Sequence, residues 1–335
     1  MPGPNVPFPP MEAELVAELP RGAWQYEPKW DGFRGVLENE GGELALWSRN
    51  GRPLLRYFPE LRALGELMPP HSALDGEIVI AREGVLDFDS MQMRLHPAES
   101  RVRKLSAEIP AEYVVFDVLL WNGEPVWKLP LEERRGRVDA LEGFRTSPCT
   151  HELADARGWL DRFESMGLDG VVAKKLGVPY LPASRDGVVK IKEEKTADCV
   201  VVGLRWKRDG EGKIATLLLG LYRDDGGVDY VGSCAVAAKT HDEMAARVLP
   251  LLDESAEQQH FSEPNRWGTG DLEEAAVRQE VAVEVRYDKV QGNRFRHGTK
   301  LLRFRDDKDP KDCTWRELRP VRDPDAPGVE ALFAS

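Results

Sequence analysis

The sequence lacks the features that mark exported and membrane proteins. Its proline-rich start, MPGPNVPFPPMEAELVAELPRGAW, contains no apolar run of the kind found in a signal peptide. No stretch approaches the roughly 20 consecutive apolar residues that a membrane-spanning helix needs. The four cysteines lie at positions 149, 199, 234 and 313 and form no CxxC pair, which argues against a zinc site or a disulfide framework. We therefore expect a reduced, cytosolic protein that makes no membrane contact.

Several common catalytic signatures are also missing. The chain has no GxxxxGK[ST] phosphate loop, no GxGxxG and no GxSxG, and its six histidines show no metal-like spacing. The net charge of −12 argues against indiscriminate binding of nucleic acids, which usually appears as overall basicity. Basic residues nevertheless gather locally, with five Lys or Arg and no acidic residue between Asn293 and Arg305. Such a patch leaves binding of a phosphate backbone open.

Up to about residue 190 the pattern alternates between short strands and helices. Residues 34–49 predict a hairpin around Gly41–Gly42, and residues 73–88 predict a strand and a turn at Glu83–Gly84. Helical spacing appears at residues 57–68 and 130–141, whereas residues 111–121, 169–175 and 187–192 are short and β-branched. This mixture indicates an α+β domain over residues 1–196.

From about residue 197 strands dominate. Residues 198–236 predict three strands with turns at Asp209–Gly210 and Asp225–Gly227, residues 241–252 a helix, and residues 281–290 and 301–305 two further strands. Five strands and one helix are typical of a small β-barrel such as an OB-fold, a known platform for nucleic acids. We predict a second, OB-fold domain over residues 197–335, including a C-terminal tail.

Lys29, in the stretch YEPKWDGFR, is the first candidate for chemistry. A lone lysine at the end of a strand is most often a solvated surface residue. A lysine nucleophile needs a lowered pKa, and Pro28, Trp30 and Phe33 could supply the desolvation that lowers it. Other polar candidates have equally ordinary interpretations: Asp–Gly pairs are common turns, and alternating lysines usually mark a solvated face of a strand.

The joint pattern is more specific than any one residue. KWDGFR, SRNGR, LDGEIVI, VVFDVL, LDGVVAKK and VVKIK follow one another in this order. Together they resemble the collinear motifs of the covalent nucleotidyltransferases, which are DNA ligases, RNA ligases and mRNA-capping enzymes. The resemblance extends from about residue 10 to residue 313 and is greatest to ATP-dependent bacterial DNA ligases of the actinobacterial ligase C group. YEPKWDGFR, SRNGRPLLRYFPEL, HPAESRV and NRFRH carry the closer match.

The resemblance implies a role for each matching residue in the first domain. Lys29 would attack the α-phosphate of ATP and carry AMP covalently. The residues implied to bind or orient the nucleotide are Glu27 at the adenine, Phe116 stacked on it, Arg34 and Glu77 at the ribose, Arg49 at a phosphate, and Asp31, Lys190 and Lys192. Asp169 and Glu77 would help to hold Mg²⁺ or Mn²⁺. Charge stabilisation by lysines, an arginine and a metal is what phosphoryl-type transfer requires.

The C-terminal segment LLRFRDDKDPKDC resembles the last ligase motif. The resemblance implies that Arg303, Arg305, Asp307 and Lys308 orient the leaving pyrophosphate while lysine is adenylated. A basic strand without a catalytic role is the plain alternative. Two departures from the family pattern occur: Asp169 stands where glutamate is usual, and Lys300 stands where an arginine is common.

The resemblance implies an ATP-dependent ligase that seals nicks in double-stranded DNA and serves DNA repair. A monomer in the bacterial cytosol, associated with the nucleoid and with DNA repair proteins, fits this function. The alternatives are a GTP-dependent capping-type guanylyltransferase, a catalytically inactive nucleotide- or DNA-binding module, and a ligase module of a multifunctional end-joining protein. SRNGR and FPEL favour the ligase over the guanylyltransferase.

Overall fold

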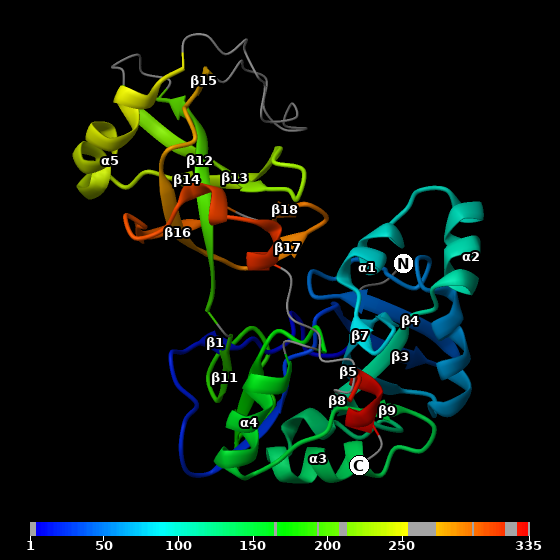
Figure 1. Ribbon diagram of the computed structural model, residues 1–335. Helices are drawn as coiled ribbons and strands as arrows, with labels where there is room; N and C mark the ends of the chain where they lie inside the picture. Colours follow the sequence, from blue (N-terminus) through cyan, green and yellow to red (C-terminus); the bar gives the residue numbers. More distant parts are fainter. Residues whose placement is uncertain are drawn as a thin grey trace. The chain divides into compact units, whose positions relative to one another are not determined.

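The structure of the protein, a computed structural model, describes residues 5–163, 166–192, 194–207, 213–253, 273–296, 298–318 and 327–333. They form two compact units: unit 1 comprises the described residues of Met1–Glu193 and Arg322–Ser335, and unit 2 those of Glu194–Val321. Both combine antiparallel sheets with helices, which confirms the predicted α+β class (Figure 1). No helix in the described residues is long and apolar enough to cross a membrane.

Unit 1 contains two main sheets and a small hairpin. The strand orders are β1-β11-β10-β2 and β4-β3-β5-β8-β9, and β6 pairs with β7. Most pairs are antiparallel, whereas β1 with β11 and β8 with β9 are parallel. The strands are β1 (Glu14–Leu15), β2 (Trp24–Pro28), β3 (Phe33–Glu40), β4 (Glu43–Ser48), β5 (Ser72–Val79), β6 (Ala81–Arg82), β7 (Val85–Leu86), β8 (Glu112–Leu120), β9 (Arg145–Thr146), β10 (Val171–Lys175) and β11 (Val188–Ile191).

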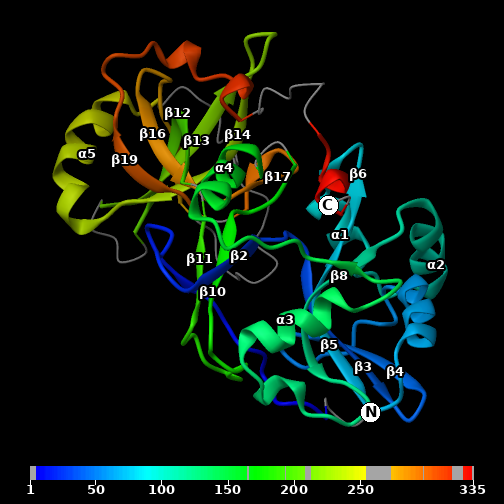
Figure 2. The same cartoon turned by 90° about the horizontal axis from the view of Figure 1, so that it is seen from below.

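Helices flank these sheets. Helix α3 (Leu131–Asp139) packs on β8, and α4 (Leu153–Phe163) packs on β2 and β10. The remaining helices of unit 1 are α1 (Phe88–Met93), α2 (Glu99–Glu108) and the 3₁₀ helices η1 (Pro59–Leu67), η2 (Val126–Lys128) and η7 (Val329–Phe333) (Figure 2). Their apolar faces cover buried strands such as β8, whose Val114, Val115 and Val118 have no exposed surface.

The predicted turns at Gly41–Gly42 and Glu83–Gly84 connect β3 to β4 and β6 to β7. All four residues have positive φ, which explains the glycines because they adopt this region without steric cost. The turn at Asp225–Gly227 joins β13 to β14, whereas the turn predicted at Asp209–Gly210 lies outside the described residues.

Unit 2 is built around one curved antiparallel sheet of order β14-β13-β12-β16-β19, with β15 paired to β12. An isolated bridge between Cys234 and Thr299 joins β14 to the residue before β19. Among the described residues no longer ladder connects these two edge strands. The strands are β12 (Lys195–Trp206), β13 (Ile214–Tyr222), β14 (Val228–Ala235), β15 (Glu274–Ala276), β16 (Ala282–Tyr287), β17 (Val290–Gln291), β18 (Arg294–Phe295) and β19 (Lys300–Phe304).

One α-helix, α5 (His241–Val248), buries Met244 and Val248 in the core of unit 2. The short 3₁₀ helices of this unit are η3 (Ala238–Thr240), η4 (Leu249–Leu251), η5 (Pro310–Asp312) and η6 (Trp315–Leu318). The C-terminal turn η7 departs from the predicted domain division, because it belongs to unit 1 rather than to the second domain. The physical reason is apolar burial: Val329, Leu332 and Phe333 pack into a hydrophobic cluster of unit 1.

Candidate active site

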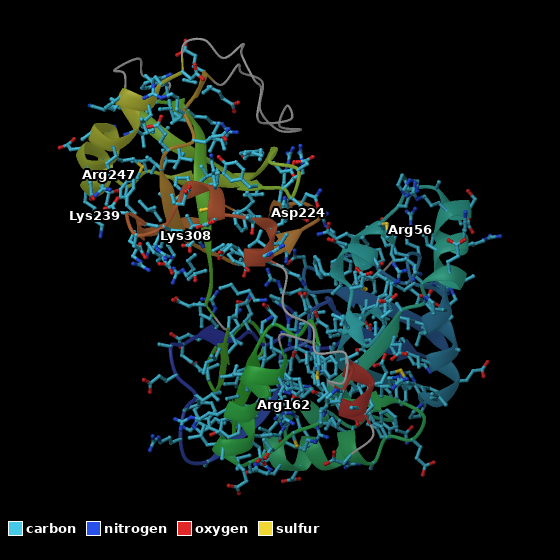
Figure 3. The ribbon with its side chains drawn as sticks, viewed as in Figure 1. Arg56, Arg162, Asp224, Lys239, Arg247 and Lys308 are labelled. Atoms are coloured by element: carbon cyan, nitrogen blue, oxygen red, sulfur yellow. The ribbon has the colours of Figure 1, made fainter. Side chains whose placement is uncertain are left out.

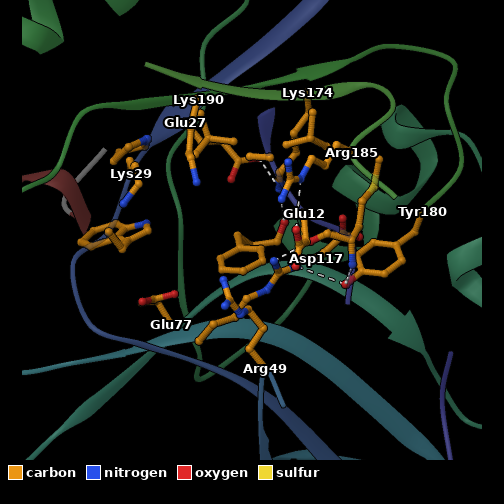
Figure 4. Close-up of a pocket in the computed structure, with 18 of the residues that line it drawn as sticks. Glu12, Glu27, Lys29, Arg49, Glu77, Asp117, Lys174, Tyr180, Arg185 and Lys190 are labelled. Carbon is orange, nitrogen blue, oxygen red and sulfur yellow. Dashed lines mark hydrogen bonds and ion pairs between the residues drawn. The ribbon is translucent and has the colours of Figure 1, made fainter. Parts of the chain in front are cut away.

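A pocket of about 290 Å³ opens in unit 1, and most of the predicted nucleotide-binding residues line it (Figure 4). Lys29 and Glu77 lie on one side of it, and Tyr180 and Arg185 lie on the opposite side. The predicted residues on its wall are Glu27, Lys29, Arg34, Arg49, Glu77, Phe116 and Lys190. Lys174 and Asp117 also line it, as do Tyr180, Arg134, Glu12 and Arg185, for which the sequence predicted no site role.

Lys29 leaves the sheet directly after β2, and its backbone is fixed at the end of the β2–β10 ladder. Its N–H donates to the carbonyl of Gly170 at 2.8 Å, and its carbonyl accepts from the N–H of Asp169 at 3.0 Å. Gly170 has φ of 125°, and a Cβ there would lie 2.0 Å from the carbonyl oxygen of Ile191. The Asp169–Gly170 pair is therefore more than a turn signal: only glycine allows the backbone that presents Asp169 to approach β11 so closely.

Asp169 joins two of the predicted catalytic lysines. Its Oδ2 lies 2.5 Å from Nζ of Lys29 and 2.8 Å from Nζ of Lys192. Burial raises the pKa of Asp169, but the two ammonium groups outweigh burial and keep that pKa below its usual value. Lys190, on β11, has a lowered pKa because of burial and of the positive charges of Lys29 and Lys192. The arrangement concentrates positive charge beside Lys29, which suits the binding of a polyanion such as a triphosphate.

Glu77, on β5, is a carboxylate that lines the same pocket as Lys29 and has a raised pKa. Burial raises its pKa to about 7, although Lys29 and Arg34 act in the opposite direction. The chain can enter β3 this close to β5 because residue 32 is glycine: a Cβ there would lie 1.9 Å from the carbonyl oxygen of Ile78. The KWDG stretch thus needs its glycine where the chain joins the β3–β5 ladder.

Arg34 is held by a buried network that the sequence did not predict. Its Nε and Nη2 donate to the two oxygens of Asp75 at 3.1 and 2.6 Å, and Asp75 is fully buried. The hydroxyl of Tyr180 donates to Asp75 at 2.6 Å and accepts the N–H of Met11 at 3.0 Å. Arg34 in turn donates to the carbonyl of Met11 at 2.5 Å, and its guanidinium carbon lies 5.4 Å from the centre of the Phe116 ring. This network attaches the N-terminal segment to the pocket wall and orients Arg34 beside Phe116.

Glu27 and Phe116 are linked through Lys174. The ammonium of Lys174 lies 2.8 Å from Glu27 and donates to the carbonyl of Phe116 at 2.9 Å. Gln25 donates to the same Glu27 carboxylate at 2.7 Å. These contacts fix the orientation of a nearly buried carboxylate. A pocket wall with an aromatic ring and a fixed hydrogen-bond acceptor has the chemistry to bind a nucleobase.

Two further ion pairs complete the wall. Arg134 and Asp117 form a buried bidentate pair, with 3% and 4% of their side chains exposed. Arg185 donates to Glu12 at 3.2 Å at the rim, where both side chains are more accessible. Asp117 lies next to Phe116 in the VVFDVL segment, which is only an indirect signal, and Arg134 lies on α3, outside every motif.

The remaining predicted residues of unit 1 occupy other positions. Asp31, Asp169 and Lys192 are not part of the pocket wall, although Asp169 and Lys192 contact each other beside Lys29. Arg49 is exposed where it borders the pocket. The described residues contain no group of three or more Asp, Glu, His or Cys side chains that could hold a metal ion, so the assignment of Asp169 and Glu77 to a metal stays a prediction.

The residues predicted from the last motif form an ion-pair network within unit 2. Asp198, on β12, accepts from Arg305 at 2.6 Å and from Lys308 at 2.9 Å through the same oxygen, Oδ2 (Figure 3 labels Lys308). Arg305 also makes a bidentate pair with Asp307, which lowers the pKa of Asp307 to about 2. Arg303 pairs instead with Glu284 across the β16–β19 ladder at 2.6 Å. Asp198 is a member of this network that the sequence did not predict.

Comparisons with known proteins agree with this site. A family model described as "ATP dependent DNA ligase domain" matches residues 10–192. The chain is 40% identical to DNA ligase C of Mycobacterium tuberculosis, over 94% of this chain and 95% of that protein, and 40% identical to DNA ligase C1 of Mycolicibacterium smegmatis, over 93% and 94%. Among solved structures, the ligase domain of M. tuberculosis LigD superposes with a TM-score of 0.50 and 26% identity, covering 92% of this chain and 98% of that one. The resemblance predicted from the motifs is thereby confirmed: the chain belongs to the ATP-dependent DNA ligase family.

Proposed function

We propose that this ATP-dependent ligase seals nicks in duplex DNA through a lysyl-AMP intermediate on Lys29. The observation that carries the proposal is the ion-paired position of Lys29 at the wall of a pocket lined by an aromatic ring, a held carboxylate and cationic side chains. In the first step Nζ of Lys29 attacks the α-phosphorus of ATP. The new N–P bond replaces the P–O bond to pyrophosphate, and Nζ, which attacks as the neutral amine, releases its proton to solvent as that bond forms.

Asp169 has the geometry to orient Lys29 in this step. Its lowered pKa makes it a weak proton acceptor, so its main contribution is to hold Nζ beside the pocket until the nucleotide arrives. Lys190 and Lys192 then stabilise the negative charge that develops on the phosphates. Asp31, which is buried one residue after Trp30, supports the loop that carries Lys29.

The pocket wall suggests how the nucleotide is recognised. Phe116 offers a ring on which the adenine stacks, and the Glu27 carboxylate accepts a hydrogen bond from its amino group. Arg34, fixed by Asp75, and Glu77 contact the ribose, and Arg49 at the border contacts a phosphate of AMP or of the nick. An acceptor at Glu27 favours adenine, which has an exocyclic amino donor, over a base that presents a carbonyl there.

Mg²⁺ or Mn²⁺ would supply further charge neutralisation on the phosphates when bound. Mg²⁺ usually takes one or two protein carboxylates together with phosphate oxygens and water. Asp169, with Glu77 as the second carboxylate, fits that limited contribution. In the present arrangement Asp169 is paired with two ammonium groups, so metal binding would require these lysines to turn towards the phosphates.

In the second step AMP passes from Lys29 to the 5′-phosphate of the nick, and in the third the 3′-hydroxyl displaces AMP and forms the phosphodiester. We assign residues 1–196 to the adenylation domain and the strand-rich part of residues 197–335 to an OB-fold domain that contacts DNA. Three features support the OB-fold assignment: the strand order of the unit 2 sheet, the bridge between Cys234 and Thr299, and helix α5. Arg303, Arg305, Asp307 and Lys308 act on the leaving pyrophosphate in the first step.

A sealing assay tests the proposal. Purified protein and Mg²⁺ are incubated with a duplex that carries one 5′-phosphorylated nick, together with ATP, GTP, NAD or no nucleotide. We expect sealing with ATP alone, its loss in Lys29→Ala, and its retention in Lys175→Ala, which removes an exposed lysine of the same sheet. GTP-dependent labelling of the protein without sealing would instead indicate a guanylyltransferase, and the absence of both reactions would indicate a binding module.

The cellular setting is part of the same proposal. Nick sealing completes excision repair and end joining, so we place the protein in the bacterial cytosol at the nucleoid, as a monomer that works with other repair proteins. Sedimentation with and without nicked duplex tests the monomer: one protein per nick is expected, and a dimer in both samples would contradict it.

A further inference from the structure

The last helical turn of the described chain packs against the residue that follows the proposed nucleophile. The ring of Phe333, in η7, stacks on the indole of Trp30 with centroids 5.2 Å apart and planes inclined by 11°. We infer that Phe333 is a positioning residue, which holds Trp30 in place and thereby fixes the backbone that aims Lys29. The inference rests on the proposed role of Lys29.

Trp30 has the contacts needed to transmit such an effect. Its side chain is buried, and its Nε1 donates to the hydroxyl of Ser147 at 3.0 Å. On the other side, the N–H and carbonyl of Lys29 are bonded to Gly170 and Asp169. The peptide of Lys29 is thus held between a strand ladder and a fixed indole. A flexible lysine side chain can meet the α-phosphate reproducibly only if its Cα is held in this way.

The turn η7 is itself anchored, so Phe333 does not merely lie on the surface. Arg145 lies over its ring at 4.7 Å from the centroid, and Arg145 is in turn paired with Glu112 at 2.6 Å. Val329 is buried, and its N–H donates to the carbonyl of Gly84 at 2.8 Å. Every one of these contacts is made within unit 1, although η7 follows unit 2 in the sequence. The end of the chain therefore returns to support the strand end that carries Lys29.

A comparison of two partial reactions tests the inference. The first is labelling of the protein by radiolabelled ATP, which requires Lys29; the second is sealing of a nick that already carries a 5′-adenylate, which requires no new adenylation of Lys29. Phe333→Ala should slow labelling about tenfold, because misplacement of a reacting group by a fraction of an ångström costs rate steeply. Sealing of the pre-adenylated nick should remain unchanged.

Three further variants make the result decisive. Phe333→Tyr retains the stacked ring and should restore labelling, and Glu330→Ala alters an exposed side chain of the same turn and should behave as wild type. Phe333→Leu retains apolar volume without the ring and should still be slow in labelling, which keeps the test valid if Phe333→Ala does not fold. An equal loss of both reactions, or wild-type labelling in Phe333→Ala and Phe333→Leu, would overturn the inference. Labelling that survives Lys29→Ala would instead refute the proposed function.

Discussion

The carboxylate of Asp169 lies 2.5 Å from Nζ of Lys29 and 2.8 Å from Nζ of Lys192, so one acidic side chain holds two of the proposed catalytic lysines. Lys29 follows β2 and Asp169 precedes β10, and these two strands are paired in the sheet. A triphosphate would compete with Asp169 for both ammonium groups, and we therefore propose that Asp169 orients Lys29 before ATP binds.

Replacing Asp169 tests this arrangement. In Asp169→Asn the attraction for both lysines is lost, and we expect labelling of Lys29 by ATP to slow about 100-fold, equivalent to about 2.7 kcal/mol of transition-state stabilisation. The melting temperature should change little, because ion pairs that retain solvent contact contribute little to stability. Asp186→Asn, at an exposed position before β11, is the control. Labelling at the wild-type rate in Asp169→Asn would contradict the orienting role.

Glu77 should make adenylation sensitive to pH near neutrality. Burial raises its pKa to about 7, so the carboxylate becomes protonated as the pH falls through this value and loses acceptor capacity for the ribose hydroxyls. We expect kcat/KM for ATP in the labelling reaction to fall below about pH 7. In Glu77→Gln, kcat/KM for ATP should be lower than in wild type, and its pH profile should lack the inflection near pH 7. Persistence of the same inflection in Glu77→Gln would assign the ionisation to another group.

The same pKa shift predicts an effect on stability. The folded state binds a proton at Glu77 more tightly than the unfolded state, whose glutamate has a pKa of 4.5. Stability from this group is therefore lost as the pH rises from 4.5 to about 7. The melting temperature of Glu77→Gln relative to wild type should increase over this range, and a constant difference would contradict the prediction.

Helix α3 offers a matched pair of substitutions for comparing buried and exposed ion pairs. Arg134→Met leaves the Asp117 carboxylate buried and unpaired, and should cost about 3–5 kcal/mol in the free energy of unfolding. Arg137→Met removes a partner of Glu124 at a site where both side chains are almost half exposed, and should cost about 0–1 kcal/mol. Denaturant titrations measure both values. The double variant Arg134→Met/Asp117→Leu should recover part of the loss, and equal costs for the two single variants would refute the distinction.

Replacing Asp198 should slow the adenylation of Lys29 more than the later steps of sealing. Asp198→Asn weakens the hold on Arg305 and Lys308, and we expect labelling by ATP to fall about tenfold because these cations are proposed to act on pyrophosphate. Sealing of a pre-adenylated nick should be much less affected. Asp306→Asn, which removes an exposed partner of Arg247, is the control. If both reactions fell equally, the network would support DNA binding rather than adenylation.

Much of the site could be predicted from the sequence because its chemistry is concentrated in short segments. KWDGFR, LDGE, LDGVV and VVKIK each place a charged residue at or near a strand end, and Lys29 and six of the predicted nucleotide-binding residues line one pocket. The turns were also predictable, since Gly41, Gly42 and Gly84 adopt positive φ without steric cost. The C-terminal turn η7 was predicted to belong to the second domain, whereas it belongs to unit 1. Its position in the sequence does not reveal which apolar surface such a short segment covers.

The type of chemistry follows from the order of the motifs, which specifies the charged groups that are available, and local spacing specifies strands and turns. Which of these groups meet depends on the tertiary structure. Tyr180 and Asp75 are 105 positions apart, and Met11 and Tyr180 are 169 apart, yet their hydrogen bonds hold Arg34. Phe333 reaches Trp30 in the same way, from the opposite end of the chain. The periodicity of hydrophobic residues indicates which side of a helix or strand is buried. The partner on that side depends on how strands and helices that are distant in the sequence pack together.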